Sequence, residues 1–378
     1  MYKVKTSQRD ILVRINGLGT ENLIDRRKEI ENMKLLSRFD VGPKVYCTFV
    51  NGLVYEFKPG REVSLSEMEK HCEAIAIRLA KFHRIVKPQS QAQAASSSSS
   101  SVHHHCPKSS NILQMTRRWM KSSMKIIETC HNKRENSSTN HTKADEEDHG
   151  VADRATCALL DSMNVPRMNK ELSHLIQLIK KYHCTIKFCH NDLQPLNIIY
   201  DENAQRIHFI DFEYCGYNYQ CFDIGNHFAE YAGLEQMDFA RYPSPDLQRR
   251  FIRAYLREVS SNRGQAQETL QSQHKPQEPS EEAVEGMRRE SNFFALLSCI
   301  AWGAWAIPQY KSSNIEFDYL RYGKQKFDLY WQMRDQFLKE FIEWREAEKR
   351  REQSAARKEQ HHPSVMTPRG YGWWSEDP

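Results

Sequence analysis

One stretch, residues 185–231, constrains the fold of this chain more than any other. It contains two short apolar runs with strand character, Ile186–Cys189 and Ile207–Ile210, and each is followed by polar residues that include an acid. The polar turn Asp201–Gln205 separates the second run from Asn197–Tyr200, so these two segments are expected to form a hairpin. The acids of this stretch therefore lie at the ends of predicted strands.

The polar residues of this stretch have the spacing of a phosphoryl-transfer site. His190, Asp192 and Asn197 follow the order H-x-D-x-x-x-x-N of the protein-kinase catalytic loop, and Asp211 stands where those kinases carry the aspartate of D-F-G. Phosphoryl transfer to a hydroxyl needs a carboxylate near the acceptor oxygen and oxygen ligands for Mg²⁺ on the triphosphate. We predict Asp192 as the base or hydroxyl-orienting group, and Asn197 and Asp211 as magnesium ligands. A lone H-x-D usually marks a turn or cap, whereas the full set favours phosphoryl transfer.

A longer block of residues resembles one family. The motifs are His190-Asn-Asp-Leu-Gln-Pro-Leu-Asn197, Ile210-Asp-Phe-Glu-Tyr214 and Tyr217–Tyr231, and together they resemble the choline/ethanolamine kinases. The resemblance implies an α+β, protein-kinase-like bilobal fold, with a small antiparallel-sheet N-terminal lobe and a larger, mostly helical C-terminal lobe. It also implies an enzyme that uses ATP and Mg²⁺ to phosphorylate a small amino alcohol. In that family the matching residues make Asp192 catalytic, let Asn197 and Asp211 hold magnesium, and line the acceptor pocket with Gln194, Tyr214 and Glu230.

Trp302 and Trp305 share a face of a helix predicted over 291–309 and broken at Pro308. Two explanations remain open: two core tryptophans, or an aromatic wall for an ammonium group, because indole faces attract cations. The resemblance favours the wall, since Trp302-Gly-Ala-Trp305 and Ile315–Tyr322 look like the family's C-terminal signature. It implies that Trp302, Trp305, Phe317 and Tyr322 join Tyr214 around the amine. Glu230 would supply the negative charge that a small ammonium needs more than a quaternary one does.

The N-terminal residues predict a small antiparallel sheet and one helix. The predicted elements are strands Tyr2–Lys5, Ile11–Ile15, Val45–Phe49 and Leu53–Phe57 and helix Asp25–Arg38. Arg14 is either an edge-strand charge that faces water or a phosphate-binding cation, and the resemblance favours the cation. Glu29 either pairs with Arg14 or is a solvated surface acid. The resemblance further implies that Glu56 and Phe57 belong to the hinge that receives the adenine.

One departure from the family concerns the nucleotide site. Family members carry a nucleotide loop before their second strand, and this chain starts at about that strand. We therefore expect residues 1–58 to form a nucleotide-binding lobe without the first strand and phosphate loop. A truncated kinase-like binding protein without turnover is thus one alternative to an ethanolamine kinase. A choline kinase is another, although Thr20–Arg26 resembles the ethanolamine branch more.

The remaining residues divide into a helical lobe, an insertion and a tail. Residues 61–86 and 155–345 are expected to form the C-terminal lobe, with a last helix over 323–345. Residues 87–154 are predicted to be a low-complexity insertion with one helix, 112–130, and residues 346–378 a disordered tail.

Composition limits the partners. The net charge of +5, from 54 basic and 49 acidic residues, is too mild to indicate nucleic-acid binding. Ten cysteines without a C-x-x-C pair, and no secretory signal at the N-terminus, indicate a cytoplasmic protein with reduced thiols. No apolar run approaches the ~20 residues of a spanning helix, so we expect no stable membrane insertion. The oligomeric state, including a homodimer, is left open.

Overall fold

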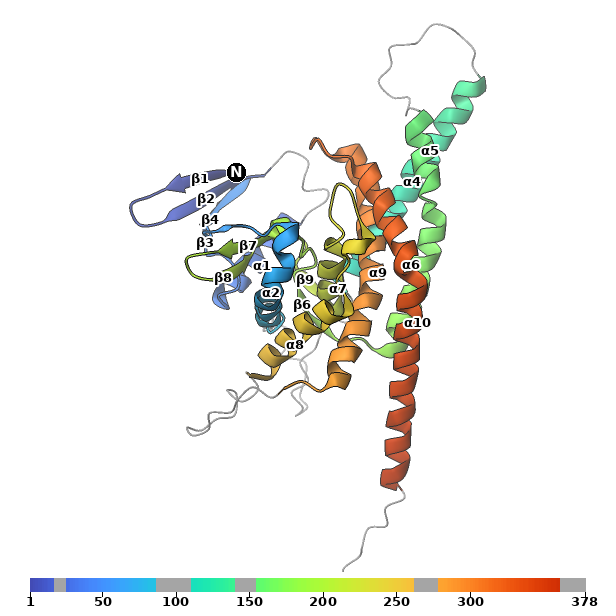
Figure 1. Ribbon diagram of the computed structural model, residues 1–378. Helices are drawn as coiled ribbons and strands as arrows, with labels where there is room; N and C mark the ends of the chain where they lie inside the picture. The colour runs from blue at the N-terminus through green and yellow to red at the C-terminus, as the bar shows by residue number, and fades with distance from the viewer. Residues whose placement is uncertain (17–24, 86–109, 140–153, 262–277, 361–378) are drawn as a thin grey trace, which may run out of the picture.

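A small sheet and a larger helical part make up the computed structural model, which describes residues 1–16, 25–85, 110–139, 154–261 and 278–360 (Figure 1). The sheet strands lie to one side. The long helices α9, Glu281–Ser312, and α10, Tyr319–Gln360, stand on the other side of the strands within residues 185–231. This arrangement confirms the predicted α+β fold, with a small antiparallel N-terminal lobe and a mostly helical C-terminal lobe.

Four antiparallel strands, in the order β1-β2-β4-β3, form the N-terminal sheet. Their bounds are β1 Tyr2–Lys5, β2 Asp10–Ile15, β3 Val45–Phe49 and β4 Gly52–Glu56, within one residue of the predictions. Gly52 begins β4 so close to β2 that a Cβ would lie 2.2 Å from the carbonyl oxygen of Arg14, which leaves room only for glycine. Helix α1, Arg26–Arg38, is capped by Asp25, whose side chain accepts a hydrogen bond from the Lys28 N–H.

Short strands within residues 185–231, the catalytic strands, carry the predicted phosphoryl-transfer residues. Strand β6, Ile186–Cys189, pairs with β9, Gly216–Tyr219, and the predicted hairpin is present as β7, Ile198–Asp201, and β8, Arg206–Phe209. The two-residue strand β5, Arg61–Glu62, adds to the edge of β7. Strands β5 and β9 were not predicted, since one is too short and the other reads Gly-Tyr-Asn-Tyr, without an apolar run.

Helix α9 is the centre of the C-terminal lobe, and α4, α7 and α10 pack against it (Figure 1). Contact with α7 is close, because a Cβ on Gly225 would lie 2.2 Å from the carbonyl oxygen of Ser291. The elements of this lobe are η2 Leu65–Glu67, α2 Met68–Phe82, α4 Asn111–Thr139, α5 Arg154–Ser162, α6 Val165–Tyr182, η3 Pro195–Asn197, α7 Gln220–Glu230, η4 Phe239–Arg241, α8 Pro245–Ser261, α9 Glu281–Ser312 and α10 Tyr319–Gln360.

The predicted break of α9 at Pro308 is wrong, because the helix continues through this residue to Ser312. Proline removes the N–H that would bind the carbonyl oxygen of Ala304. The hydroxyl of Ser123 on α4 lies 3.0 Å from that oxygen and shares its one proton between it and the carbonyl oxygen of Trp119, at 2.8 Å. A neighbouring helix thereby satisfies the carbonyl that the proline frees.

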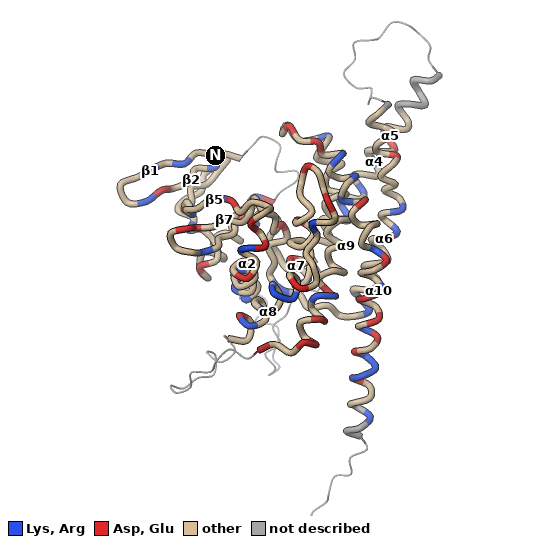
Figure 2. The backbone as a smooth tube through the Cα atoms, in the orientation of Figure 1, with Lys and Arg blue, Asp and Glu red and all other residues tan. Residues whose placement is uncertain are grey.

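The predicted boundaries of the tail and insertion also need correction. Helix α10 extends to Gln360, so the prediction of disorder is wrong for 346–360, where strong helix formers predominate and both charge signs alternate along the helix (Figure 2). Helix α4 is longer than predicted and is part of the main core, with Ile112, Trp119 and Met120 buried. Residues 87–109, 140–153 and 361–378, which complete these predicted segments, lie outside the described residues.

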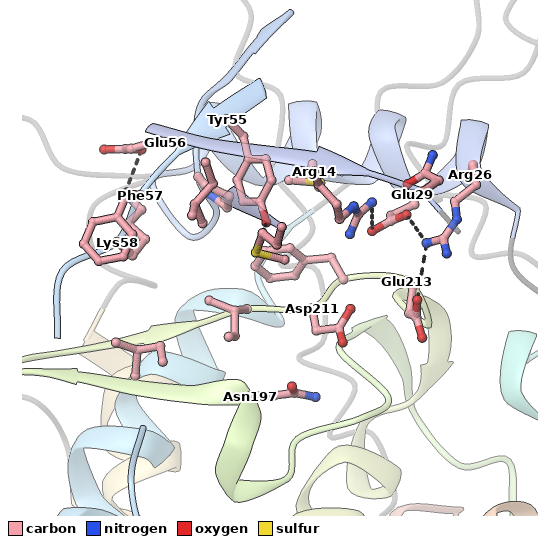
Figure 3. Close-up of a pocket in the computed structure, with 18 of the residues that line it drawn as sticks. Arg14, Arg26, Glu29, Tyr55, Glu56, Phe57, Lys58, Asn197, Asp211 and Glu213 are labelled. Carbon is pink, nitrogen blue, oxygen red and sulfur yellow. Dashed lines mark hydrogen bonds and ion pairs between the residues drawn. The ribbon is translucent and has the colours of Figure 1, made fainter. Parts of the chain in front are cut away.

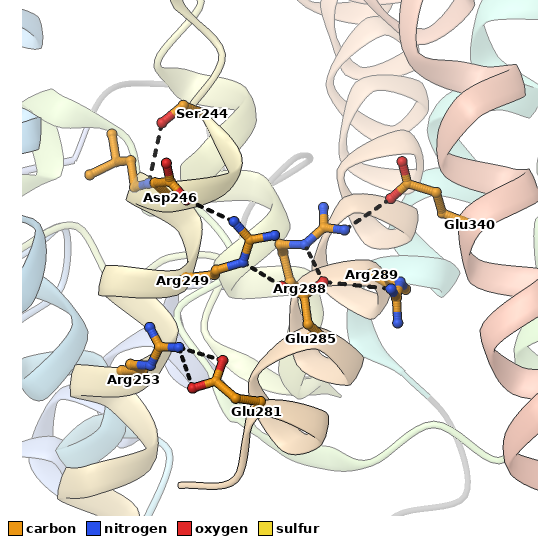
Figure 4. A network of polar contacts seen from close by, with 10 residues as sticks. Ser244, Asp246, Arg249, Arg253, Glu281, Glu285, Arg288, Arg289 and Glu340 are labelled. Carbon is orange, nitrogen blue, oxygen red and sulfur yellow. Dashed lines mark hydrogen bonds and ion pairs between the residues drawn. The ribbon is translucent and has the colours of Figure 1, made fainter. Parts of the chain in front are cut away.

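Charged side chains join α8, α9 and α10 (Figure 4). Glu285 on α9 lies at the centre, 2.5 Å from Arg249 on α8 and 3.0 Å from Arg288. Arg288 reaches on to Glu340 of α10 at 3.2 Å. This network fixes the three helices relative to one another below the catalytic strands.

Helix α9 is also, among the described residues, the one helix whose length and apolar composition would allow it to cross a membrane. Within the protein, 89% of its apolar window is buried. The central core helix of a folded domain passes the same test, so this finding is weak support for a membrane span.

Candidate active site

One buried carboxylate shapes the loop that follows β6. Asp223 on α7 accepts hydrogen bonds from the backbone N–H groups of His190, at 2.7 Å, and Asn191, at 2.6 Å. Its Oδ2 also lies 3.0 Å from Nε2 of His83, whose other ring nitrogen is 2.8 Å from the Tyr255 hydroxyl. Asn191 has a φ of 72°, so the anchored loop turns sharply just before Asp192.

Sequence reasoning did not single out Asp223. A signal was present, because an acid inside the apolar run Cys221–Ile224 needs buried donors. His83, Cys189 and Asp223 also form a metal-ligand-like cluster, with ligand atoms within 4.8 Å of one another. The Asp223 carboxylate already faces two backbone donors and the His83 ring, which explains the cluster as loop support.

The structure brings Asp192 and Asn197 together. The Asn197 side-chain amide donates to the carboxylate of Asp192 at 2.9 Å and to its backbone oxygen at 2.8 Å. Burial raises the pKa of Asp192 well above its usual range, and the charges of Asp211, Glu230 and Glu213 raise it further. The Asn197 amide thus holds the Asp192 carboxylate in one orientation.

His190, the first residue of the motif, has a structural role here. Its Nε2 lies 2.9 Å from the carbonyl oxygen of Ile210, directly before Asp211. Burial lowers the pKa of His190, so the ring is neutral at pH 7. The catalytic loop and the strand that leads to Asp211 are thus joined by one side chain.

A cavity of about 400 Å³ lies between the N-terminal sheet and the catalytic strands (Figure 3). All four residues predicted for the nucleotide line it, together with both predicted magnesium ligands: Arg14, Glu29, Glu56, Phe57, Asn197 and Asp211. Figure 3 shows Arg14 and Glu29 on the sheet side of the cavity and Asp211 and Asn197 on the opposite side. The predicted nucleotide residues therefore face the predicted metal ligands across one cavity.

Arg14 and Glu29 form an ion pair, with 2.7 Å between Nη2 and Oε1. Glu29 is buried and Arg14 is only 17% exposed in its side chain, so neither residue is the solvated surface charge that the sequence left open. Arg26 extends the network, at 3.0 Å from Glu29 and 3.4 Å from Glu213. Arg26 and Glu213 were not predicted as site residues, although both flank predicted ones in sequence.

The predicted hinge residues Glu56 and Phe57 line the cavity, but some polar groups of Glu56 already have hydrogen-bond partners within the protein. The Glu56 carboxylate accepts from the backbone N–H of Lys44 at 3.0 Å and lies 2.9 Å from the Lys58 ammonium (Figure 3). The Glu56 N–H donates to the carbonyl of Lys44 at 2.8 Å. The N–H and the Oε2 atom of Glu56 are therefore already engaged within the protein.

Asp211 and Glu213 line the cavity, and the positive charges around them do not fully neutralise these acids. Burial and then Asp211 raise the pKa of Glu213 to about 7, and burial and then Glu29 raise the pKa of Asp211. Oxygen ligands with this excess of negative charge match the preference of Mg²⁺. Asn197, Asp211 and Glu213 therefore suit a divalent cation.

All five predicted aromatic residues lie in one cluster. Ring centroids are separated by 5.2 Å for Tyr214–Trp302, 5.6 Å for Trp302–Trp305, 6.2 Å for Trp305–Tyr322 and 5.6 Å for Phe317–Tyr322. Trp305 Nε1 donates to the Tyr214 hydroxyl at 3.0 Å, and Trp302 Nε1 to Asn226 Oδ1 at 2.8 Å. The indole N–H groups of Trp302 and Trp305 are thus paired, and the rings of the cluster meet through their faces and edges.

Trp119 of α4 also belongs to this cluster. It stacks on Trp302, with centroids 5.9 Å apart, and meets Tyr214 edge-on at 6.1 Å. The sequence had assigned this residue to the apolar face of a helix within an insertion. Trp119 lies between low-complexity segments, so no local pattern connected it with Trp302.

Two buried acceptor oxygens near the cluster have no partner in the described structure. They are Oε1 of Gln194 and Oε2 of Glu230, both predicted acceptor-site residues. The other Glu230 oxygen lies 2.7 Å from the buried ammonium of Lys326. A ligand with an N–H or O–H donor would satisfy the free oxygen of Glu230.

Comparison with known proteins agrees with this geometry. The family model for choline/ethanolamine kinase matches residues 1–331. The chain belongs to this family. Ethanolamine kinase 2 of Rattus norvegicus is 33% identical over 339 residues, which cover 88% of this chain and 72% of that protein.

Solved structures of the family share the fold. The ethanolamine kinase of Plasmodium vivax matches with a TM-score of 0.65 and 24% identity, over 87% of this chain and 78% of that one. The choline kinase of Cryptosporidium parvum matches with a TM-score of 0.58 and 21% identity, over 88% of this chain and 84% of that one. These two structures show the fold. The match of the family model and the relative that is 33% identical confirm the resemblance of the sequence to the choline/ethanolamine kinases.

Proposed function

We propose that this protein is an ethanolamine kinase that transfers the γ-phosphoryl group of ATP to the hydroxyl of ethanolamine, with Mg²⁺ as metal. The observation that carries the proposal is the surroundings of Asp192: its carboxylate is bound by Asn197, which lines the nucleotide cavity, and the charges of Asp211, Glu213 and Glu230 all act on it. Curated relatives named as ethanolamine kinases support the choice of substrate.

In this proposal Asp192 accepts a hydrogen bond from the substrate hydroxyl and takes its proton. The hydroxyl oxygen forms a bond to the γ-phosphorus while the bond to the β–γ bridging oxygen breaks, so that ADP leaves and phosphoethanolamine forms. Asn197 holds the Asp192 carboxylate in place through its side-chain amide. Bound magnesium would offset phosphate charge, and Asn197, Asp211 and Glu213 would hold it.

Arg14 has the position for a phosphate contact. Glu29 fixes its guanidinium over the cavity, and Asp211 lies on the opposite side (Figure 3). A planar guanidinium suits phosphate oxygens because its donors are forked. The Trp302–Trp305 cluster and Glu230 would receive the ammonium end.

The test is MgATP-dependent ADP release with ethanolamine, with choline and with neither. We expect ethanolamine to stimulate turnover more than choline does. Asp192→Ala should reduce kcat by on the order of 10³ while the unfolding midpoint stays near that of the wild type. Stronger stimulation by choline would instead favour a choline kinase, and absence of any stimulated turnover would refute the proposal.

Two further expectations accompany the enzyme. None of the nine cysteines in the described residues is in a disulfide, which supports the proposal of a reducing, cytoplasmic location. A homodimer remains a prediction, and sedimentation of the full chain would test it.

A further inference from the structure

Helices α7 and α10 are joined by an ion pair that is fully removed from solvent. Lys326 Nζ lies 2.7 Å from Glu230 Oε1, and the side chains are 0% and 3% exposed. Lysine is seldom buried completely, and a buried pair is often no more stabilising than an apolar pair of the same size. Stability alone therefore gives a weak explanation for this pair.

Glu230 lies on the face of α7 that serves the active site. His227, one turn earlier, has Nδ1 3.1 Å from the carbonyl oxygen of Leu193 in the catalytic loop. Asn226, four residues before Glu230, accepts from Trp302. Residues three and four apart share a helix face, so Glu230 lies beside both the loop and the aromatic cluster.

The negative charge of Glu230 acts on both Asp192 and Tyr322. After burial and Asp211, it raises the pKa of Asp192, and after burial it is the first cause that raises the pKa of Tyr322. The geometry agrees, because the Lys326 ammonium lies 2.7 Å from Glu230 Oε1 and 5.3 Å from the centre of the Tyr322 ring in the predicted aromatic wall.

The Lys326 ammonium lies beside the aromatic wall, where a cation is attracted by the Tyr322 ring. Lys326 follows Tyr322 by one helical turn, and its ammonium lies 5.3 Å from the centroid of the Tyr322 ring. A ring at this distance attracts a cation. The lysine therefore already uses part of the aromatic surface that a methylated ammonium would need.

The ion pair engages one oxygen of Glu230 and leaves the other unpartnered. Oε2 is buried without a hydrogen-bond donor in the described structure, as is Oε1 of Gln194. A primary ammonium has three N–H donors, whereas a quaternary ammonium has none. The free oxygen of Glu230 therefore suits a primary amine better than a quaternary one.

We propose that Lys326 is a specificity-determining residue that makes the acceptor site selective for a primary ammonium. Its ammonium group holds Oε1 of Glu230, directs Oε2 toward the substrate, and takes the Tyr322 surface that N-methyl groups would occupy. This inference rests on the proposed amino-alcohol kinase activity.

The test uses ethanolamine and its N-methyl, N,N-dimethyl and N,N,N-trimethyl derivatives. With wild-type enzyme, kcat/KM should fall at each added methyl group. In Lys326→Met, Glu230 loses the donor that holds Oε1, so Oε2 is no longer directed toward a primary amine. The emptied Tyr322 face favours the trimethyl substrate. Both changes lower the ethanolamine-to-choline ratio of kcat/KM, by about tenfold or more.

Further variants separate selectivity from folding. Lys326→Gln keeps an N–H donor but loses the charge, so it should lower the ratio less, and it decides the question if Lys326→Met does not fold. Lys326→Arg keeps the pair and should retain the ratio. Lys324→Met is the matched control, because Lys324 pairs with Asp328 outside the cluster, at 2.6 Å, and should leave the ratio unchanged.

The outcomes distinguish this inference from the proposed function. Wild-type enzyme without amine-stimulated turnover would refute the function. Active wild type with a flat methylation series, or folded Lys326→Met and Lys326→Gln with the wild-type ratio, would refute the role of Lys326. The KM for ATP should stay constant throughout, and a parallel rise in that KM would indicate a general structural defect instead.

Discussion

Replacing Asp223 by asparagine should both destabilise the protein and displace its catalytic loop. The carboxylate accepts from the N–H groups of His190 and Asn191 and contacts the His83 ring, with full burial. Asparagine keeps one oxygen. If this oxygen serves His190 and His83, the new amide nitrogen faces the Asn191 N–H, so two donors oppose each other.

The magnitude follows from these three contacts. One lost charge-assisted bond costs about 2 kcal/mol, and the two that become neutral weaken by about 1 kcal/mol each, for a total of roughly 4 kcal/mol. Asn191, held at a φ of 72°, loses its anchor next to Asp192. A displacement of the base by about 1 Å lowers kcat by about 10²-fold.

Urea unfolding followed by tryptophan fluorescence, together with kcat for ethanolamine, measures both effects. Asp246→Asn is the matched control, because this carboxylate is 94% exposed and pairs with Arg249 at the surface. The control should change the free energy of unfolding by less than about 1 kcal/mol. If Asp223→Asn behaves like Asp246→Asn in both assays, Asp223 does not hold the loop.

Three other predictions address the metal site, the aromatic cluster and the proline of α9. Burial and Asp211 raise the pKa of Glu213 to about 7, so its proton stabilises the folded protein below about pH 4.5 and this contribution is lost as the pH rises through 7. MgATP should therefore release a fraction of a proton at pH 6.5–7, as calorimetry in buffers of different ionisation enthalpy would detect, and Glu213→Gln should abolish that release. Trp119→Ala should raise the KM for ethanolamine several-fold through Trp302 and Tyr214 while the KM for ATP stays constant, and an equal rise in both would contradict its place in the acceptor site. Ser123→Ala should lower the free energy of unfolding in urea by about 1 kcal/mol. The loss should be smaller in a Pro308→Ala background, because residue 308 then regains an N–H for the Ala304 carbonyl. An equal loss in both backgrounds would refute that explanation.

Sequence predicted those parts of the site whose residues lie close together in the chain. Asp192, Asn197 and Asp211 flank two neighbouring strands, so their spacing and the apolar runs were sufficient to bring them together. Trp302 and Trp305 share one helix face, and the family resemblance added the remaining aromatic residues.

Other contacts depended on folding over long distances and had no local pattern. Trp119 reaches Trp302 from a helix flanked by low-complexity sequence, and Lys326 meets Glu230 across two helices. Pro308 normally indicates a helix end, and only the hydroxyl of Ser123, from another helix, reverses that expectation. The extension of α10 to Gln360 was missed because a charged, polar composition is shared by disordered tails and solvated helices.

Helix α4 sets a limit on how this chain can be shortened. Ser110 donates to Asn218 at 2.6 Å, Asn111 is 3.0 Å from the Lys28 ammonium, and Trp119 packs on the aromatic cluster. Deleting 87–153 as a single expendable loop would therefore remove a wall of the site and a tie to the N-terminal lobe. An expression design for crystallisation should shorten the serine-rich and acidic flanks separately and retain residues 110–139.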